Sequence, residues 1–210
     1  MEILKNFAVL EGPDGSGTTT QLNILENFFQ ENRKSLPYLF KTFEPTNGSI
    51  GKLIRANLRK EVIFSPETVA LLFAADRNEH LWGPGGIVEH CKAGELVVSD
   101  RYLPSSLVYQ GITCGEELPG RLNRDFPGPE LLIFLDIDPE TAQSRINGRG
   151  QKEIFEYLDF QIKVRERYRK LLPILSEQGV VVHTIDASLP VEEVAREVWM
   201  ALQKMPIFER

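Results

Sequence analysis

A doubly wound α/β fold with a five-stranded parallel sheet and helices on both faces is the architecture that this sequence predicts. Short apolar runs alternate with segments of helical spacing along the chain, as expected for strands buried between two helical layers. The first run, residues 7–10, leads into a glycine-rich loop. A helix follows from Thr20 to Gln30, with Leu22, Leu25 and Phe29 along one side. Strand, glycine-rich loop and helix therefore open the fold.

The remaining elements follow in alternation. Four further apolar runs predict strands at residues 38–40, 96–98, 131–135 and 180–185. Helices are expected to begin near Ser49, Pro66, Pro139, Phe155 and Pro190, and proline in a first turn loses no helical hydrogen bond. Gly83 to Gly86 should interrupt one helix. We find no repeat or linker, so residues 1–210 are interpreted as one domain.

Length and composition exclude several classes of protein. The chain has 210 residues, 42% hydrophobic and 26% charged, which is typical of one globular domain. Its net charge of -6 argues against a nucleic-acid groove. The two cysteines, Cys91 and Cys114, have no metal-ligand spacing. The short apolar run at the amino end is too brief for a signal peptide, and no run is long enough for a membrane helix, so we expect a cytoplasmic protein.

The segment from Gly12 to Thr19 matches the phosphate-loop pattern GxxxxGK[ST] except that Thr18 replaces the lysine. Its glycines allow backbone N–H groups to surround phosphate oxygens at a helix N-terminus. Thr19 occupies the position whose hydroxyl meets a phosphate-bound Mg²⁺, and Thr20 can cap the helix or support the loop. The alternative is a plain glycine turn with capping threonines. The phosphate-binding candidates are Gly12, Pro13, Asp14, Gly15, Ser16, Gly17, Thr18, Thr19 and Thr20.

Five blocks of sequence, taken in order, resemble the thymidylate kinase family of nucleoside-monophosphate kinases. They are residues 11–17, 73–77, 100–111, 135–139 and 185–188. The third block contains Asp100-Arg101-Tyr102 and Tyr109-Gln110-Gly111. The resemblance runs from about Phe7 to Trp199. It implies transfer of the γ-phosphoryl group of ATP to thymidylate (dTMP), with Mg²⁺ as cofactor, by a homodimer with a doubly wound sheet.

Asp100 and Arg101 end the third predicted strand, where open α/β sheets bind ligands. Arg101 can bridge the donor and acceptor phosphates, and Asp100 can hold waters of Mg²⁺ or orient Thr19. A salt bridge between the two neighbours is the alternative.

The acceptor site is expected on two helical faces. Phe73 and Arg77 lie four residues apart, so a ring for base stacking can stand beside a guanidinium for base oxygens. Ser106 and Gln110 have the same spacing and can hydrogen-bond the base. Core packing of Phe73 and ordinary surface polarity of the other pair are the alternatives.

The resemblance assigns further roles. It implies that Asp14 binds the sugar 3′-hydroxyl, that Arg55 reaches the acceptor phosphate, and that Glu44 belongs to the acceptor site; an Asx-turn is the alternative for Asp14. Residues 148–155 are interpreted as a short lid, with Arg149 and Lys152 as catalytic cations. Arg145 is a further ATP-site candidate.

The sequence departs from the family's pattern at Thr18, which replaces the loop lysine, at Phe43, where the family usually has arginine, and at Ile154, where many bacterial members have a lid arginine. These losses keep a second hypothesis open, a nucleotide-binding homologue without transfer activity. A third is a kinase for another pyrimidine monophosphate. A homodimer is expected through the helix containing Val69, Ala70, Leu72, Phe73, Ala74 and Ala75, because it is more apolar than a one-sided surface helix requires.

Overall fold

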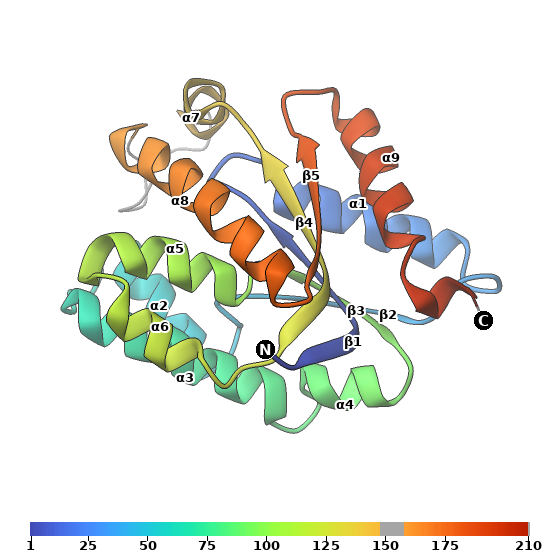
Figure 1. Cartoon of the computed structure of the whole chain (residues 1–210), viewed down its shortest axis with the longest axis horizontal. Coiled ribbons are helices and arrows are strands. Elements are labelled where there is room, and N and C mark those ends of the chain that lie inside the picture. Colours follow the sequence, from blue (N-terminus) through green and yellow to red (C-terminus); the bar gives the residue numbers. More distant parts are fainter. Residues whose placement is uncertain (148–157, 210) are drawn as a thin grey trace.

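A computed structural model describes residues 1–147 and 158–209 and contains one parallel five-stranded sheet (Figure 1). The strand order is β2-β3-β1-β4-β5. The strands are β1 (Ile3–Glu11), β2 (Leu39–Phe43), β3 (Leu96–Asp100), β4 (Gly128–Asp136) and β5 (Val181–Asp186). The predicted fold class is confirmed. All five predicted runs lie within or overlap these strands.

The helices expected near Ser49, Pro66, Pro139 and Pro190 begin at or next to those residues, whereas the starts of α5 and α6 were not predicted. Their bounds are α1 (Thr18–Glu31), α2 (Ser49–Leu58), α3 (Pro66–Trp82), α4 (Ile87–Lys92), α5 (Leu103–Cys114), α6 (Glu117–Asn123), α7 (Pro139–Asn147), α8 (Leu158–Glu177) and α9 (Val191–Leu202), and a 3₁₀ turn follows at Pro206–Glu209. Gly83 to Gly86 separate α3 from α4, as predicted. The start expected at Phe155 lies outside the described residues.

Alternating side chains of β1 divide the core between the two faces of the sheet, since successive strand residues point in opposite directions. Ala8 and Leu10 pack with apolar residues of α1 and α9. Phe7 and Val9 pack with residues of α3, α4 and α5 on the other face. Figure 1 shows the same two layers, with α1 and α9 on one side of the sheet and α3, α5 and α8 on the other.

The parallel register brings the carboxyl ends of the central strands together. Leu10 of β1 and Phe43 of β2 both pair with Asp100 of β3. The chain moves from β1 to β2 across β3, and from β3 to β4 across β1, so the order reverses at β1. Ligands of open α/β sheets bind at such a reversal, beyond the carboxyl ends of the strands. The phosphate loop after β1 lies at this point.

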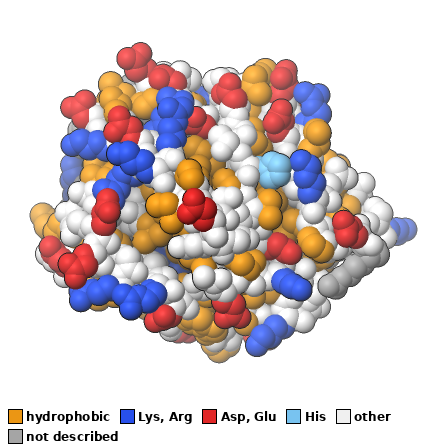
Figure 2. All heavy atoms as spheres, in the orientation of Figure 1, with side chains coloured by type: hydrophobic (Ala, Val, Ile, Leu, Met, Phe, Trp, Pro, Cys, Tyr) orange, Lys and Arg blue, Asp and Glu red, His pale blue; other side chains and the backbone are white. Residues whose placement is uncertain are grey.

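On the face shown in Figure 2, Lys and Arg side chains are interspersed with Asp and Glu, without one continuous basic field. Among the helices of the described residues, none is both long enough and apolar enough to span a bilayer.

Candidate active site

The phosphate loop follows β1 and turns directly into α1. Gly17 is the N-cap of α1 at φ 96°, a left-handed conformation that favours glycine. A Cβ added at Gly12 would lie 2.8 Å from the backbone oxygen of Leu135 and closer still to Ser16, so glycine lets the loop pass close to β4. α1 has no side-chain cap hydrogen bond in the described structure. Its first amides therefore suit an anionic ligand.

The three threonines of the loop have different surroundings. Thr18, in the position of the usual lysine, is buried at the first residue of α1. Thr20 is exposed, and the prediction that it caps α1 is wrong because the helix starts two residues earlier, after Gly17. The Oγ1 of Thr19 donates to Oδ2 of Asp100 at 2.5 Å.

Asp100 has one oxygen without a protein partner. Its Oδ2 accepts from Thr19, whereas its Oδ1 is buried and meets no hydrogen-bond donor among the described residues. A buried carboxylate oxygen that lacks a protein partner loses the free energy of a hydrogen bond unless a water, an ion or a ligand supplies one. A carboxylate beside a hydroxyl is the oxygen-only donor set that Mg²⁺ prefers.

Arg101 has a strained backbone that turns its side chain toward the loop. Its φ is 71°, unusual for a residue with a side chain. Two hydrogen bonds hold this conformation, from Arg101 N to the oxygen of Leu10 at 2.9 Å and from Ser99 Oγ to the oxygen of Arg101 at 2.7 Å. The guanidinium then donates to the backbone oxygen of Gly12 at 2.9 Å and to Asp14 Oδ1 at 2.5 Å.

Electrostatics keep Arg101 charged. Burial by itself lowers its pKa, but the influence of Tyr109 and Asp14 outweighs burial, so the pKa is raised well above its ordinary value. The site therefore retains a cation beside the phosphate loop at any physiological pH.

Gln161 connects α8 to the phosphate loop. Its Oε1 accepts a hydrogen bond from the backbone N of Asp14 at 3.0 Å, and its Nε2 donates to Asp14 Oδ2 at 2.9 Å. Gln161 is fully buried. Because Arg101 binds the other oxygen, Asp14 is held from both sides.

Glu11, the last residue of β1, anchors the start of α5. Its carboxylate accepts from Tyr102 N at 2.9 Å, from Ser105 Oγ at 2.7 Å and from Tyr168 Oη at 2.7 Å. Burial raises the pKa of Glu11, while the nearby Arg101 charge and these hydrogen bonds act in the opposite direction. The arrangement fixes the segment that carries Arg101.

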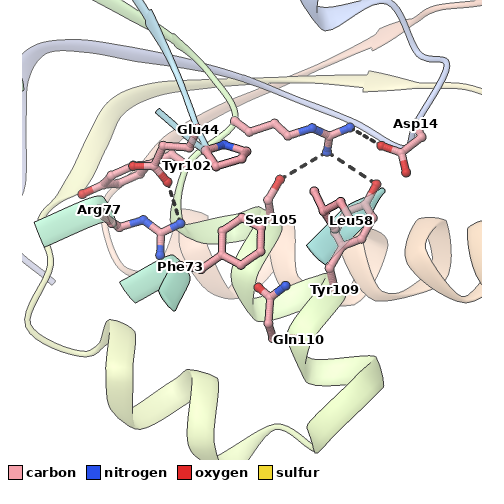
Figure 3. A pocket seen from close by; sticks show the side chains of 11 residues that line it. Asp14, Glu44, Leu58, Phe73, Arg77, Tyr102, Ser105, Tyr109 and Gln110 are labelled. Carbon is pink, nitrogen blue, oxygen red and sulfur yellow. Dashed lines mark hydrogen bonds and ion pairs between the residues drawn. The ribbon is translucent and has the colours of Figure 1, made fainter. Parts of the chain in front are cut away.

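A cavity opens beside the loop (Figure 3). Its walls come from the phosphate loop, the end of β2, α2, α3 and α5. It holds about 580 Å³ of empty space including its open mouth. The lining residues are Asp14, Glu44, Pro45, Leu58, Phe73, Arg77, Arg101, Tyr102, Ser105, Tyr109 and Gln110.

Arg77 is the most deeply buried cation of this cavity. Its Nη2 lies 2.6 Å from Glu44 Oε2, in an ion pair whose side chains are 1% and 2% exposed. The same nitrogen donates to Ser106 Oγ at 3.1 Å, and Nη1 donates to Asn123 Oδ1 at 2.5 Å. Nε has no acceptor among the described residues. Glu44 neutralises the charge of the guanidinium, so an uncharged ring can bind against this wall of the cavity.

The structure brings most of the predicted acceptor residues together. Six of them line the cavity: Asp14, Glu44, Phe73, Arg77, Arg101 and Gln110. Ser106 is buried behind Arg77 and bonds to it, and its neighbour Ser105 faces the cavity instead. Arg55 donates to the backbone oxygens of Pro45 and Thr46 and lies over the Phe43 ring, 5.5 Å from its centroid.

Three other residues of the predicted site are not among those that line this cavity in the described structure. Arg145 is exposed in the last turn of α7. Arg149 and Lys152 lie outside the described residues.

The sequence did not indicate several wall and support residues. Tyr102, Ser105 and Tyr109 belong to a block that resembled the family, and the four-residue spacing of Ser105 and Tyr109 was the available signal. Leu58 and Gln161 lie in ordinary helical segments and carried no local signal.

A phosphate loop, a strand-end arginine beside it and an adjacent cavity define a P-loop nucleoside-monophosphate kinase. Comparison with known proteins gives the family. The family model described as Thymidylate kinase matches residues 10–198, and the chain belongs to the thymidylate kinase family.

Three relatives illustrate the similarity. A protein of Treponema pallidum (strain Nichols) is 48% identical over 172 residues, covering 81% of each chain. One of Pyrobaculum aerophilum is 41% identical over 204 residues, covering 97% of this chain and 99% of its own. One of Clostridium novyi (strain NT) is 36% identical over 203 residues, covering 91% and 95%. All three bear the name thymidylate kinase, the first two in a provisional form.

Proposed function

We propose that this chain transfers the γ-phosphoryl group of ATP to dTMP, giving ADP and dTDP, with the acceptor bound in the cavity beside the phosphate loop. One observation carries the proposal. Phe73, Arg77 and Gln110 line the same cavity as Asp14 and Arg101, so one nucleotide can contact base-binding and phosphate-binding groups together. Family membership supports the same reaction.

The base of dTMP is assigned to the α3 and α5 wall. Phe73 supplies a ring for stacking, and Arg77 supplies N–H donors for a carbonyl oxygen of the base. Gln110 can both donate and accept, which suits the mixed edge of thymine. Because Glu44 already balances the charge of Arg77, a neutral base binds there without burying an unpaired cation.

The phosphates are assigned to the opposite end of the cavity. Backbone amides of the loop and of the first turn of α1 receive those of ATP, and Arg101 lies where donor and acceptor phosphates meet. Asp14 is assigned to the sugar hydroxyl and Arg55 to the acceptor phosphate. In this chemistry the protein mainly positions two phosphates and stabilises the charge that develops between them.

Magnesium is the metal that these residues fit. Thr19 and Asp100 would hold it, partly through water, because the unpartnered Asp100 Oδ1 and the hydroxyl beside it offer oxygen ligands at the loop. When bound, the ion neutralises phosphate charge. The protein's own part is to hold these oxygens at the loop.

Two further features belong to this proposal. A lid role is assigned to residues 148–155, which lie outside the described residues, with Arg149 and Lys152 acting on the transferring phosphoryl group, and Arg145 is assigned to ATP. The enzyme is a homodimer through α3. Of the residues expected at that interface, Val69, Ala70 and Ala74 are buried within the chain, whereas Leu71 and Trp82 of the same helix are 51% and 50% exposed.

The experiment is a coupled assay of ADP release with ATP, Mg²⁺ and a panel of dTMP, dUMP, dCMP and UMP. We expect the highest kcat/KM with dTMP. A higher value with another member of the panel would reassign the acceptor, and release that needs no acceptor would leave only an ATPase.

A further inference from the structure

His80 connects the end of β2 to Arg77 on the cavity wall, through Glu44. It lies on α3 one turn beyond Arg77. Its Nδ1 is 3.1 Å from Glu44 Oε1, and its Nε2 is 2.5 Å from Thr42 Oγ1. The His80 side chain is only 8% exposed and does not itself line the cavity among the described residues. Glu44 therefore has a histidine on one oxygen and Arg77 on the other.

The direction of these hydrogen bonds follows from the groups involved. A carboxylate can only accept, so Nδ1 of His80 carries the hydrogen that faces Glu44. In the neutral imidazole Nε2 then accepts from the hydroxyl of Thr42. Glu44 thus selects the tautomer of His80, and the Thr42 hydroxyl, which can donate or accept, donates to the other ring nitrogen.

The consequence for Arg77 is geometric. An ion pair through Oε2 alone leaves the carboxylate free to rotate and Oε1 buried without a donor. The His80 contact removes both possibilities, so the Glu44 carboxylate and the guanidinium bound to it keep one orientation. Arg77 also donates hydrogen bonds to Asn123 and Ser106, which restrict the orientation of its guanidinium further.

We propose that His80 is a positioning residue that sets the pyrimidine specificity of the acceptor site through Glu44 and Arg77. The inference rests on the proposed function. A guanidinium only donates, so it favours a base with an oxygen on the contacted edge, as thymine has, over cytosine, which carries an amino group there. Discrimination between dTMP and dCMP therefore depends on how firmly Arg77 is held.

Three substitutions separate the two ring nitrogens. His80→Asn places an amide nitrogen near the position of Nδ1 and keeps the donor to Glu44. His80→Gln places its amide near the position of Nε2, toward Thr42, and His80→Leu removes both contacts. For each variant we would measure kcat and KM with dTMP and with dCMP at saturating ATP, and equilibrium binding of both nucleotides by calorimetry.

We expect His80→Leu to raise the KM and Kd for dTMP about tenfold, the scale of one lost hydrogen bond to a charged group, with kcat changed less than about twofold. The preference for dTMP over dCMP should fall by a similar factor. His80→Gln should behave like His80→Leu, and His80→Asn should stay within about twofold of the native protein. Thr42→Val should shift the preference in the same direction by about threefold.

The matched control is His90→Leu. His90 also pairs with a carboxylate, Glu95 at 2.5 Å, but it lies on α4 outside the cavity. Its replacement should leave the preference unchanged. Thermal unfolding of every variant identifies one that fails to fold, in which case His80→Gln and Thr42→Val decide the question.

Equal losses for dTMP and dCMP in His80→Leu would overturn the proposal, since a merely structural role affects both nucleotides alike. A loss of dTMP affinity and of preference over dCMP in His80→Asn equal to that in His80→Leu would also overturn it. If the native chain binds dTMP without phosphorylating it, the proposed function fails, and the calorimetric comparison still decides the role of His80. A native chain that does not bind dTMP rejects both.

Discussion

Arg101 Nη2 lies 2.5 Å from Asp14 Oδ1, so a residue that follows β3 is tied to the loop that follows β1. The same guanidinium donates to the backbone oxygen of Gly12. A cation is thereby fixed at a phosphate loop in which Thr18 replaces the usual lysine. The pair supports the proposal that phosphoryl transfer proceeds without that lysine.

Arg101→Ala should remove most of the activity. The variant loses the cation beside the loop and leaves Asp14 with an unbalanced charge. We expect kcat to fall about 10²- to 10³-fold, the usual effect of deleting one preorganised donor. The coupled assay measures it, with Arg124→Ala, an exposed arginine after α6, as the control. A variant with native kcat would contradict this role.

Gln161 should matter through Asp14. Gln161→Ala removes both hydrogen bonds to Asp14, and we expect kcat to fall about tenfold because the loop carboxylate loses its fixed position. Gln161→Glu should be worse, since its carboxylate would face that of Asp14. Gln178→Ala, at an exposed position after α8, is the control. If the glutamate variant is the more active of the two, this account of Gln161 is wrong.

Local patterns in the sequence predicted the fold well. The run from Phe7 to Leu10 with the loop after it fixed the first strand and helix, and proline near helix starts marked Pro66 and Pro139. Arg77 and Phe73 were predicted because they belong to a block that resembled the family and because helical spacing placed them on one face. Each of these signals acts within a few residues, which is the distance over which spacing rules hold.

Long-range contacts escaped prediction. Gln161 meets Asp14 across 147 positions of sequence, and nothing near either residue indicates that contact. Ser105 rather than Ser106 faces the cavity because the rotation of α5 is set by packing on the sheet, whereas the spacing to Gln110 favoured Ser106. The capping role expected for Thr20 failed because the helix begins earlier than its apolar pattern.

Thr18→Lys should change activity modestly. The loop amides, Arg101 and Mg²⁺ share the stabilisation of the phosphates. One added cation therefore changes the total stabilisation only modestly. We expect kcat within about tenfold of the native value in either direction. An increase by many powers of ten, from an inactive native chain, would mean that this chain is a degenerate nucleotide-binding homologue.

Arg149 and Lys152, outside the described residues, are expected to act together. Replacing both by alanine should lower kcat about 10²-fold or more, as for the loss of a preorganised donor at the transferring group. Single-turnover kinetics would separate this effect from product release. Unchanged chemistry would reject the lid assignment.

Association through α3 predicts the oligomeric state of the chain in solution. The native chain should sediment as a dimer at micromolar concentration, and Leu71→Asp should shift it toward the monomer by placing a charge in an apolar interface. Met200→Asp, at a similarly exposed position on α9, should leave the dimer intact. A native chain that is only monomeric would reject this interface.

The most direct measurement is formation of dTDP by the unaltered chain from ATP and dTMP, followed by chromatography with and without Mg²⁺. Nucleotide binding is measured on the same preparation. The account predicts dTDP that accumulates with time, requires Mg²⁺ and nearly disappears in Arg101→Ala. Binding of ATP and dTMP without any dTDP would contradict it.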